Sequence, residues 1–177
     1  TIDQARDVVD SGLDEIIISL DGVDQATYER YRVGGKLEHV LTGARLLAQA
    51  KAEAGSSKPL VNLQFIVFKH NEQDIAEAER IALDVGADKF LVKTAQVYTN
   101  EEADEFLPEN EQYRRYSEAE TSTLAVKGQP SSGCKVLWYS SMVNWNGAVA
   151  PCCFDKNVDF KMGEAFGGEG SFDQAWQ

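Results

Sequence analysis

The stretch that decides the fold is Glu15-Ile16-Ile17-Ile18-Ser19-Leu20-Asp21-Gly22. Its run of β-branched and aliphatic residues is too short for a helix and is typical of a strand buried on both faces. The Asp-Gly pair at its end is a turn signal that terminates the strand. Two further buried strands are predicted downstream, at Leu60–Phe68 and Lys89–Val92.

Helical patterns alternate with these strands. Apolar residues recur every three or four positions, and Asn71 is the expected cap of the last helix. The inner helix faces consist of Ala5, Val8 and Val9, then Leu37, Val40, Leu41, Ala44, Leu47 and Ala48, then Ile75, Ala78, Ala82 and Val85. This alternation predicts an α/β fold with parallel strands and right-handed crossovers.

Three parallel strands are few for an independent sheet. Such sheets occur with both faces covered, as parts of a larger open sheet or a barrel. Two unpaired edge strands are expected to promote self-association. We therefore expect this chain, which begins at Thr1 rather than Met, to be a segment of a longer protein.

The composition limits the function classes. Hydrophobic residues make up 43% and charged residues 26% of the chain, as in folded soluble proteins. The net charge of −12 would repel phosphate backbones, so no nucleic-acid partner is expected. No apolar run approaches the roughly 18 residues of a membrane helix, and no secretory signal opens the chain. We expect a cytoplasmic protein with no membrane partner.

The character of the sequence changes after residue 98. Residues 1–98 are expected to form the α/β unit. Residues 99–133 are predicted to be an acidic linker with one short helix near Glu111–Tyr116. Residues 134–177, which are rich in aromatic residues and glycine, are expected to form a small second unit.

Polar residues follow each predicted strand. They comprise Ser19 and Asp21 after the first, Lys69, His70 and Asn71 after the second, and Lys93, Thr94 and Gln96 after the third. In parallel α/β proteins the loops at this edge of the sheet form the ligand face. The same residues would also suit a solvent-facing rim. His70 is expected to be a surface loop residue, and His39 a structural one.

All three cysteines lie between residues 134 and 153. An odd number in so short a stretch does not resemble a disulfide framework, and in a reducing cytosol it indicates a metal site or buried thiols. Asn146-Gly147 predicts a type I′ hairpin turn that draws Cys134 toward Cys152. Converging thiolates suit zinc or an iron–sulfur cluster, with at least one further ligand supplied from elsewhere.

The spacing from Cys134 through Gly147 to Cys152, CX12GX4C, resembles the opening of a SPASM domain, the cysteine-rich extension of many radical S-adenosylmethionine (SAM) enzymes. Met162-Gly163 and the segment 171–176 resemble the stretch before its later cysteines. Ile18-Ser19-Leu20-Asp21-Gly22, with the Tyr31-Arg32 and Gly34-Gly35-Lys36 segments, resembles strand four and the following helix of the radical SAM barrel. The resemblance spans most of the chain.

The resemblance implies an α/β fold in which a partial parallel barrel of the TIM type, about strands four to six, precedes a truncated SPASM β-hairpin unit. The three-cysteine motif CxxxCxxC of the family and the later SPASM cysteines are absent, so this fragment alone is expected to be inactive. The parent is implied to be a radical SAM oxidoreductase or maturase. Its SAM and catalytic 4Fe-4S cluster would generate a 5′-deoxyadenosyl radical that abstracts hydrogen from a peptide, protein or small-molecule substrate.

The resemblance also implies site residues. Ser19 would contact the ribose or methionyl part of SAM, Arg32 would pair with its carboxylate, and Asp21 would bond nearby or cap the next segment. Gln64 is expected to point into the barrel. The alternatives are an ordinary surface arginine at Arg32 and a simple tight turn at Asp21-Gly22.

Cys134 and Cys152 are the implied ligands of an auxiliary 4Fe-4S cluster. Cys153 is a third candidate, but on an extended strand it would point away from Cys152, which favours a buried bystander over a third ligand. Trp138 and Trp145 are expected to cover the hairpin.

Two other functions fit the residues. The first is a non-catalytic zinc- or peptide-binding module with Cys134, Cys152 and Cys153 as ligands. The second is a barrel-type aldolase or isomerase that forms a Schiff base through Lys69 or Lys93.

Overall fold

The structure is a computed structural model that describes residues 1–117, 125–127, 135–153, 155, 157–166 and 171–176. The chain divides into two compact units, Thr1–Gly128 and Gln129–Gln177, which are described separately. The first unit contains helices α1 (Ile2–Asp10), α2 (Gln25–Glu29), α3 (Leu37–Ala54) and α4 (Ile75–Asp84), and strands β1 (Glu15–Ser19), β2 (Leu60–Val67) and β3 (Lys89–Thr94). In the described ranges no helix is long and apolar enough to cross a membrane.

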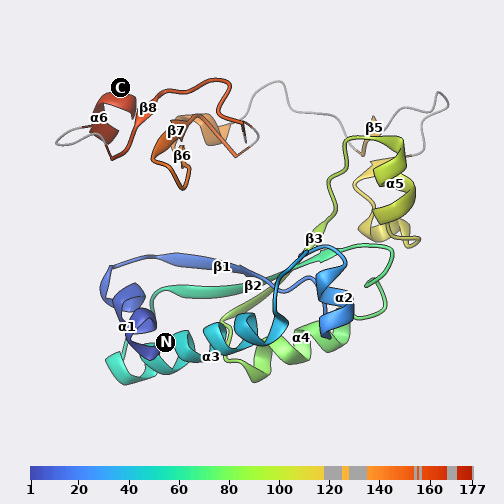
Figure 1. Cartoon of the computed structure of the whole chain (residues 1–177), viewed down its shortest axis with the longest axis horizontal. Helices are drawn as coiled ribbons and strands as arrows, with labels where there is room; N and C mark the ends of the chain where they lie inside the picture. Colours follow the sequence, from blue (N-terminus) through green and yellow to red (C-terminus); the bar gives the residue numbers. More distant parts are fainter. Residues whose placement is uncertain (118–124, 128–134, 154, 156, 167–170, 177) are drawn as a thin grey trace. The chain divides into compact units, whose positions relative to one another are not determined.

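The three strands form a parallel sheet in the order β1-β2-β3. Helices α3 and α4 pack on one face of it, and α1 packs on α3. Figure 1 shows these helices together on one side of the sheet. The predicted parallel α/β arrangement is therefore confirmed.

The core lies between the sheet and the helices. Alternate residues of β2, namely Val61, Leu63, Phe65 and Val67, are fully buried there against α3 and α4 residues such as Ala44 and Ala78. The opposite face carries none of helices α1–α4 (Figure 1). Ile17 on that face is 56% exposed, so the prediction that the first strand is buried on both faces is wrong. The reason is that the described part of this unit places helices on one side only.

The acidic segment after β3 carries more structure than the sequence predicted. It contains helix α5 (Asn100–Phe106) and a short antiparallel pair, β4 (Tyr116–Ser117) with β5 (Ala125–Val126). The helix predicted near Glu111–Tyr116 is only a 3-10 turn, η1 (Glu111–Tyr113), and Tyr116 lies in β4. The buried Tyr116 hydroxyl bonds to the backbone of Val97, with its oxygen 3.0 Å from the carbonyl oxygen and 3.2 Å from the amide nitrogen. The segment is thereby fixed to the end of the third strand. Helix α5 was missed because its acidic residues show no apolar period.

The second unit is a small antiparallel sheet. It contains η2 (Lys135–Trp138), β6 (Met142–Val143), β7 (Ala148–Ala150), β8 (Gly163–Glu164) and helix α6 (Ser171–Trp176). The strand order is β6-β7-β8, and β7 is buried throughout. A Cβ on Gly163 would lie 2.7 Å from the Ala175 Cβ, so the absence of a side chain lets α6 approach β8. The pairing of β6 with β7 confirms a hairpin around Asn146-Gly147, but residues 136–138, which were predicted as the start of its first strand, lie in η2 instead. Strand β8 is a third strand that the sequence did not predict.

Candidate functional site

Ser19 and Gln64 are neighbours near the carboxyl ends of β1 and β2. The parallel register pairs them directly, and Leu20 N donates to the Gln64 carbonyl at 2.9 Å. Because Ile18 and Leu63 face the helices, alternation places Ser19 and Gln64 on the helix-free face. Both are half-buried. The structure thus brings together two of the residues that the sequence proposed for a cofactor site.

Asp21 follows β1 and is fully buried, with φ of 44°. Its Oδ1 accepts the Ile66 N–H at 2.7 Å. Its Oδ2 accepts the Arg32 Nε–H at 2.7 Å, and Arg32 Nη2 lies 2.5 Å from the same oxygen. A buried aspartate therefore links the end of β1, the end of β2 and the segment after α2.

The negative charge of Asp21 is paired with the positive charge of Arg32. Burial raises the pKa of Asp21, although the Ile66 N–H and the Arg32 guanidinium act in the opposite direction. The Arg32 side chain is 33% exposed, and its guanidinium carbon lies 5.0 Å from the Tyr31 ring centroid. Arg32 is thus not an ordinary surface arginine. It offers its remaining N–H donors from a guanidinium whose positive charge already has a partner.

Asn71 lies in the loop after β2 and does not cap the next helix, as the sequence suggested. The N-cap of α4 is Asp74. Asn71 is 1% exposed, and its Nδ2 donates to the Asp21 carbonyl at 3.1 Å and to the Ile66 carbonyl at 3.0 Å. Its Oδ1 accepts the Phe68 N–H at 2.7 Å. An asparagine before a helix favours a cap, but here its side chain bonds within the loop, to the end of β2 and to the turn after β1.

An aromatic cluster borders this edge of the sheet. The Phe68 ring lies 4.4 Å from Tyr31, 5.4 Å from His70 and 5.9 Å from Phe106, measured between centroids. His70 stacks on Phe68 at an interplanar angle of 5° and is half-buried, so it is not the plain surface residue that was expected. Its Nε2 is buried and has no hydrogen-bond partner among the residues that the structure describes. Burial, followed by the charge of Arg30, lowers the pKa of His70, which favours the neutral imidazole.

The two lysines of the Schiff-base alternative are both exposed. Lys69 Nζ lies 3.9 Å from a Glu109 carboxylate oxygen. A Schiff-base lysine is activated by desolvation in an apolar pocket or by a neighbouring cation. Exposure of Lys69 and Lys93 gives the aldolase or isomerase alternative no support.

The second candidate site follows the hairpin of the C-terminal unit. Gly147 N donates to the Asn144 carbonyl at 2.8 Å, and Asn144 N donates to the Ala148 carbonyl at 2.9 Å. Gly147 has φ of 88°, whereas Asn146 does not adopt a positive φ. The predicted type I′ turn is therefore wrong, because that turn needs positive φ at both central residues. The bonding is that of a three-residue loop in which glycine alone takes the left-handed conformation.

Cys152 and Cys153 are free thiols just beyond β7, the first half-buried and the second exposed. Both lie in a bend and turn rather than on an extended strand, so strand alternation does not set their directions. The expectation that Cys153 is a buried bystander is wrong, because its side chain is exposed. Asp155 N donates to the Cys152 carbonyl at 3.2 Å, and the Asp155 carboxylate accepts the N–H groups of Asp159 and Phe160 at 2.8 and 3.0 Å. These bonds order the loop after the cysteine pair.

Cys152 and Cys153 have the chemistry to bind an iron–sulfur cluster, because cysteine thiolates are the protein ligands of such clusters. Cys134, the remaining candidate, lies outside the described residues. Within the described ranges, no three His, Cys, Asp or Glu side chains converge as a metal site. The two described cysteines are fewer than the four thiolates that a complete cluster site uses.

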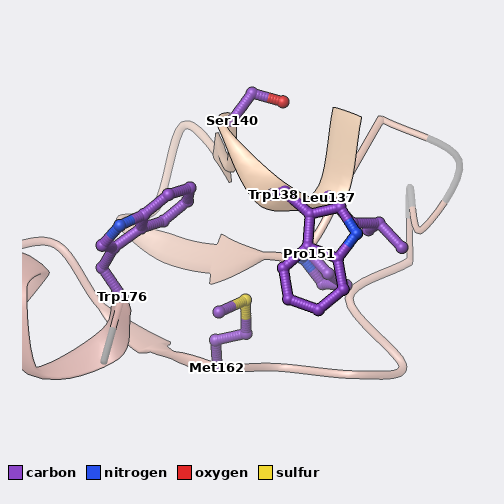
Figure 2. Close-up of a pocket in the computed structure, with 6 residues that line it drawn as sticks. All are labelled: Leu137, Trp138, Ser140, Pro151, Met162 and Trp176. Atoms are coloured by element: carbon purple, nitrogen blue, oxygen red, sulfur yellow. The ribbon is translucent and has the colours of Figure 1, made fainter. Parts of the chain in front are cut away.

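The tryptophans of this unit do not cover the hairpin as predicted. Trp138 and Trp145 are 85% and 93% exposed. Trp138 instead borders an apolar pocket of about 290 Å³, which Leu137, Ser140, Pro151, Met162 and Trp176 also line. Figure 2 shows the Trp138 and Trp176 rings on opposite sides of this pocket, with Met162 between them.

Comparison with known proteins finds a match for the C-terminal unit. The family model of SPASM, an iron-sulfur cluster-binding domain, matches residues 134–177. That range includes both described cysteines and the three-stranded antiparallel sheet. No curated protein matches the chain.

Proposed function

We propose that the chain is part of a radical SAM enzyme, in which residues 1–98 form about strands four to six of a partial (β/α) barrel and residues 134–177 bind an auxiliary 4Fe-4S cluster. The observation that carries this proposal is the match of residues 134–177 to an iron–sulfur cluster-binding domain. In the same chain, a parallel sheet presents the Ser19–Gln64 pair on its helix-free face. An iron–sulfur domain joined to such a sheet is the combination that the sequence resemblance implies.

The sheet supports the barrel part of the proposal in two ways. Its strand order follows the chain order, and its helices share one side, as in a barrel in which the other side is the interior. The helix-free face also carries Asn62, which is 1% exposed and whose Oδ1 has no partner in the described part of the chain. A buried acceptor without a donor suits a face that further strands complete.

In this proposal the edge of the sheet binds SAM. Ser19 and Gln64 would offer a hydroxyl and an amide to the ribose or methionyl part. Arg32 would direct its unused N–H donors at the SAM carboxylate while Asp21 holds the guanidinium in place. The cofactors, when bound, supply the radical chemistry, and this chain's residues bind, orient and shield them.

Cys134 and Cys152 would hold the auxiliary cluster, together with ligands from elsewhere in the protein. The exposed Cys153 is the weaker candidate. We place the enzyme in the cytoplasm, where thiols stay reduced. The proposed substrate is a peptide, a protein or a small molecule, and a peptide or protein is favoured by analogy with other enzymes that carry such extensions.

The first test is the reading frame on both sides of this segment. We expect an upstream CxxxCxxC motif and additional downstream cysteines. The encoded protein, reconstituted anaerobically with iron and sulfide, should show the broad visible absorbance of iron–sulfur clusters. A colourless protein that binds zinc instead would favour the zinc-binding module.

The second test is SAM binding to that reconstituted protein by equilibrium dialysis. Ser19→Ala and Gln64→Ala should each weaken binding about tenfold, the effect of losing one hydrogen bond. Ser57→Ala, an exposed serine before the opposite end of β2, is the matched control and should bind normally. Equal binding by all three variants would contradict the proposed SAM site.

A further inference from the structure

Asn71 connects the ends of two strands through one buried side chain. Its Nδ2 donates to the carbonyl groups of Asp21 and Ile66, and its Oδ1 accepts the Phe68 N–H. We propose that Asn71 is a positioning residue that fixes the Asp21–Arg32 pair at the carboxyl edge of the sheet.

The hydrogen bonds form a closed circuit. Ile66 donates its N–H to the Asp21 carboxylate at 2.7 Å and accepts at its carbonyl from Asn71 at 3.0 Å. Asn71 Nδ2 also donates to the Asp21 carbonyl at 3.1 Å, which closes the circuit. Main chain and side chain of Asp21 are thus both fixed to the end of β2, so its carboxylate has one position from which to hold Arg32.

The backbone at Asp21 explains why the three hydrogen bonds of the Asn71 side chain, here called the Asn71 brace, are needed. A φ of 44° is disfavoured for a residue that carries a Cβ, and it persists where surrounding contacts determine it. The next residue is Gly22, where a Cβ would lie 2.4 Å from Tyr28 N, so α2 packs directly on this turn. Arg32 N in turn donates to the Tyr28 carbonyl at 3.0 Å. The turn that Asn71 holds therefore sets the place of the segment that carries Arg32.

The rate at which the Arg32 guanidinium reacts with a labelling reagent measures the effect of the Asn71 brace without any cofactor. Arg32 Nε and Nη2 are engaged by Asp21, whereas Arg45 is exposed on the surface of α3 and forms no ion pair within the described residues. A reagent that modifies arginine, such as phenylglyoxal, should label Arg32 slowly and Arg45 quickly in the wild-type chain. Peptide mass spectrometry measures both rates in the same sample.

The test compares Asn71→Ala and Asn71→Asp with Asn62→Ala. Asn62 is a matched control because it is also 1% exposed and lies on β2, but it bonds to Glu15 rather than to Asp21. Loss of the Asn71 donors should raise the labelling rate of Arg32 about tenfold, while the rate of Arg45 is unchanged and Asn62→Ala matches the wild type. An Arg32 rate that does not change in the Asn71 variants, or that rises equally in Asn62→Ala, overturns the proposal.

If neither Asn71 variant folds, hydrogen exchange in the wild-type chain decides. We then expect slow exchange of both the Asn71 side-chain amide and the Arg32 Nε–H, measured by NMR on the 15N-labelled protein. Exchange of the Arg32 Nε–H as fast as that of the exposed Arg45 would overturn the proposal.

The consequence for SAM rests on the proposed function, but the labelling and exchange experiments do not. If the intact protein binds no SAM while Asn71→Ala still raises the labelling rate of Arg32, the proposed function is wrong and the role of Asn71 is supported. If SAM binds and Arg32 stays protected in Asn71→Ala, the brace fails and the proposed function stands.

Discussion

Lys51 and Asp88 join the last turn of α3 to the start of β3 through an ion pair of 2.5 Å. The same Asp88 oxygen accepts the Val61 N–H at 2.6 Å, so one carboxylate connects a helix and two strands. Lys51 is only 8% exposed, and a buried ammonium group depends on its partner. Burial alone would raise the pKa of Asp88, but the bonds from Lys51 and Val61 outweigh it and lower the pKa overall.

We expect Asp88→Asn to lower the free energy of unfolding by about 1–2 kcal/mol, because Lys51 loses its counter-ion. Urea denaturation at pH 7, followed by circular dichroism, measures the change. Since the folded-state pKa of Asp88 is lowered, its contribution is complete above about pH 4 and is lost as the pH falls through the folded-state pKa. The difference between wild type and variant should therefore shrink on acidification.

The control for this pair is Lys58→Met. Lys58 pairs with Asp14 on the surface, where both side chains are mostly exposed, and such pairs contribute little. The urea midpoint of Lys58→Met should match the wild type. An equal loss in the Lys58 and Asp88 variants would mean that burial of Lys51 does not matter.

His70 should make the unfolding free energy depend on pH near neutrality. Its pKa is lowered in the folded state, so the folded chain binds a proton less readily than the unfolded chain. The stabilisation is present above about pH 6.5 and is lost as the pH falls through the folded-state pKa. In His70→Phe, which keeps an aromatic ring against Phe68, the urea midpoint should fall less between pH 7.5 and pH 5 than in the wild type.

The chain has only two histidines, so the exposed His39 is the natural control. His39→Phe should keep the pH dependence of the wild type. The interpretation of His70 is wrong if His39→Phe removes that dependence and His70→Phe retains it.

Two glycines beside or within α3 should respond to alanine with opposite signs. Gly86 has φ of 77°, and a Cβ there would lie 2.8 Å from the Ala48 Cβ. Gly86→Ala should cost about 1–2 kcal/mol for the left-handed backbone alone. Gly43 lies inside α3 with no atom within 4 Å of an added Cβ, so Gly43→Ala should raise stability by about 0.5–1 kcal/mol. Urea midpoints of the two variants on the same side of the wild type would contradict this.

The sequence predicted the parts of the fold that depend on local pattern. The strand after Asp14, the long helix from Leu37 and the parallel pairing all follow from apolar periodicity and from turn residues. Helix α5 was not predicted because its stability comes from a Thr99 cap and from acidic residues near its start rather than from an apolar face. Local pattern also does not reveal that one face of β1 stays uncovered.

The candidate site was less predictable because its contacts span the sequence. Ser19 and Gln64 were named from resemblance, but their pairing depends on the register between strands 45 residues apart. The bonds of Asn71 to Asp21 connect residues 50 positions apart, and no local signal distinguishes them from a helix cap. His70 was named from its place after the second strand, but its half-buried position against Phe68 depends on contacts that local pattern does not show.

The cysteines allow the sharpest test of the C-terminal unit. Cys152 is half-buried, and its carbonyl accepts the Asp155 N–H, whereas Cys153 is exposed. In the full-length protein, anaerobically reconstituted, Cys152→Ala and Cys134→Ala should each lower the iron content by about one cluster, roughly four iron atoms per chain. Cys153→Ala is the matched control and should retain nearly all of its iron. If Cys153→Ala loses as much iron and sulfide as Cys152→Ala, burial does not distinguish the ligand, and both thiols of the bend must be assigned to the cluster.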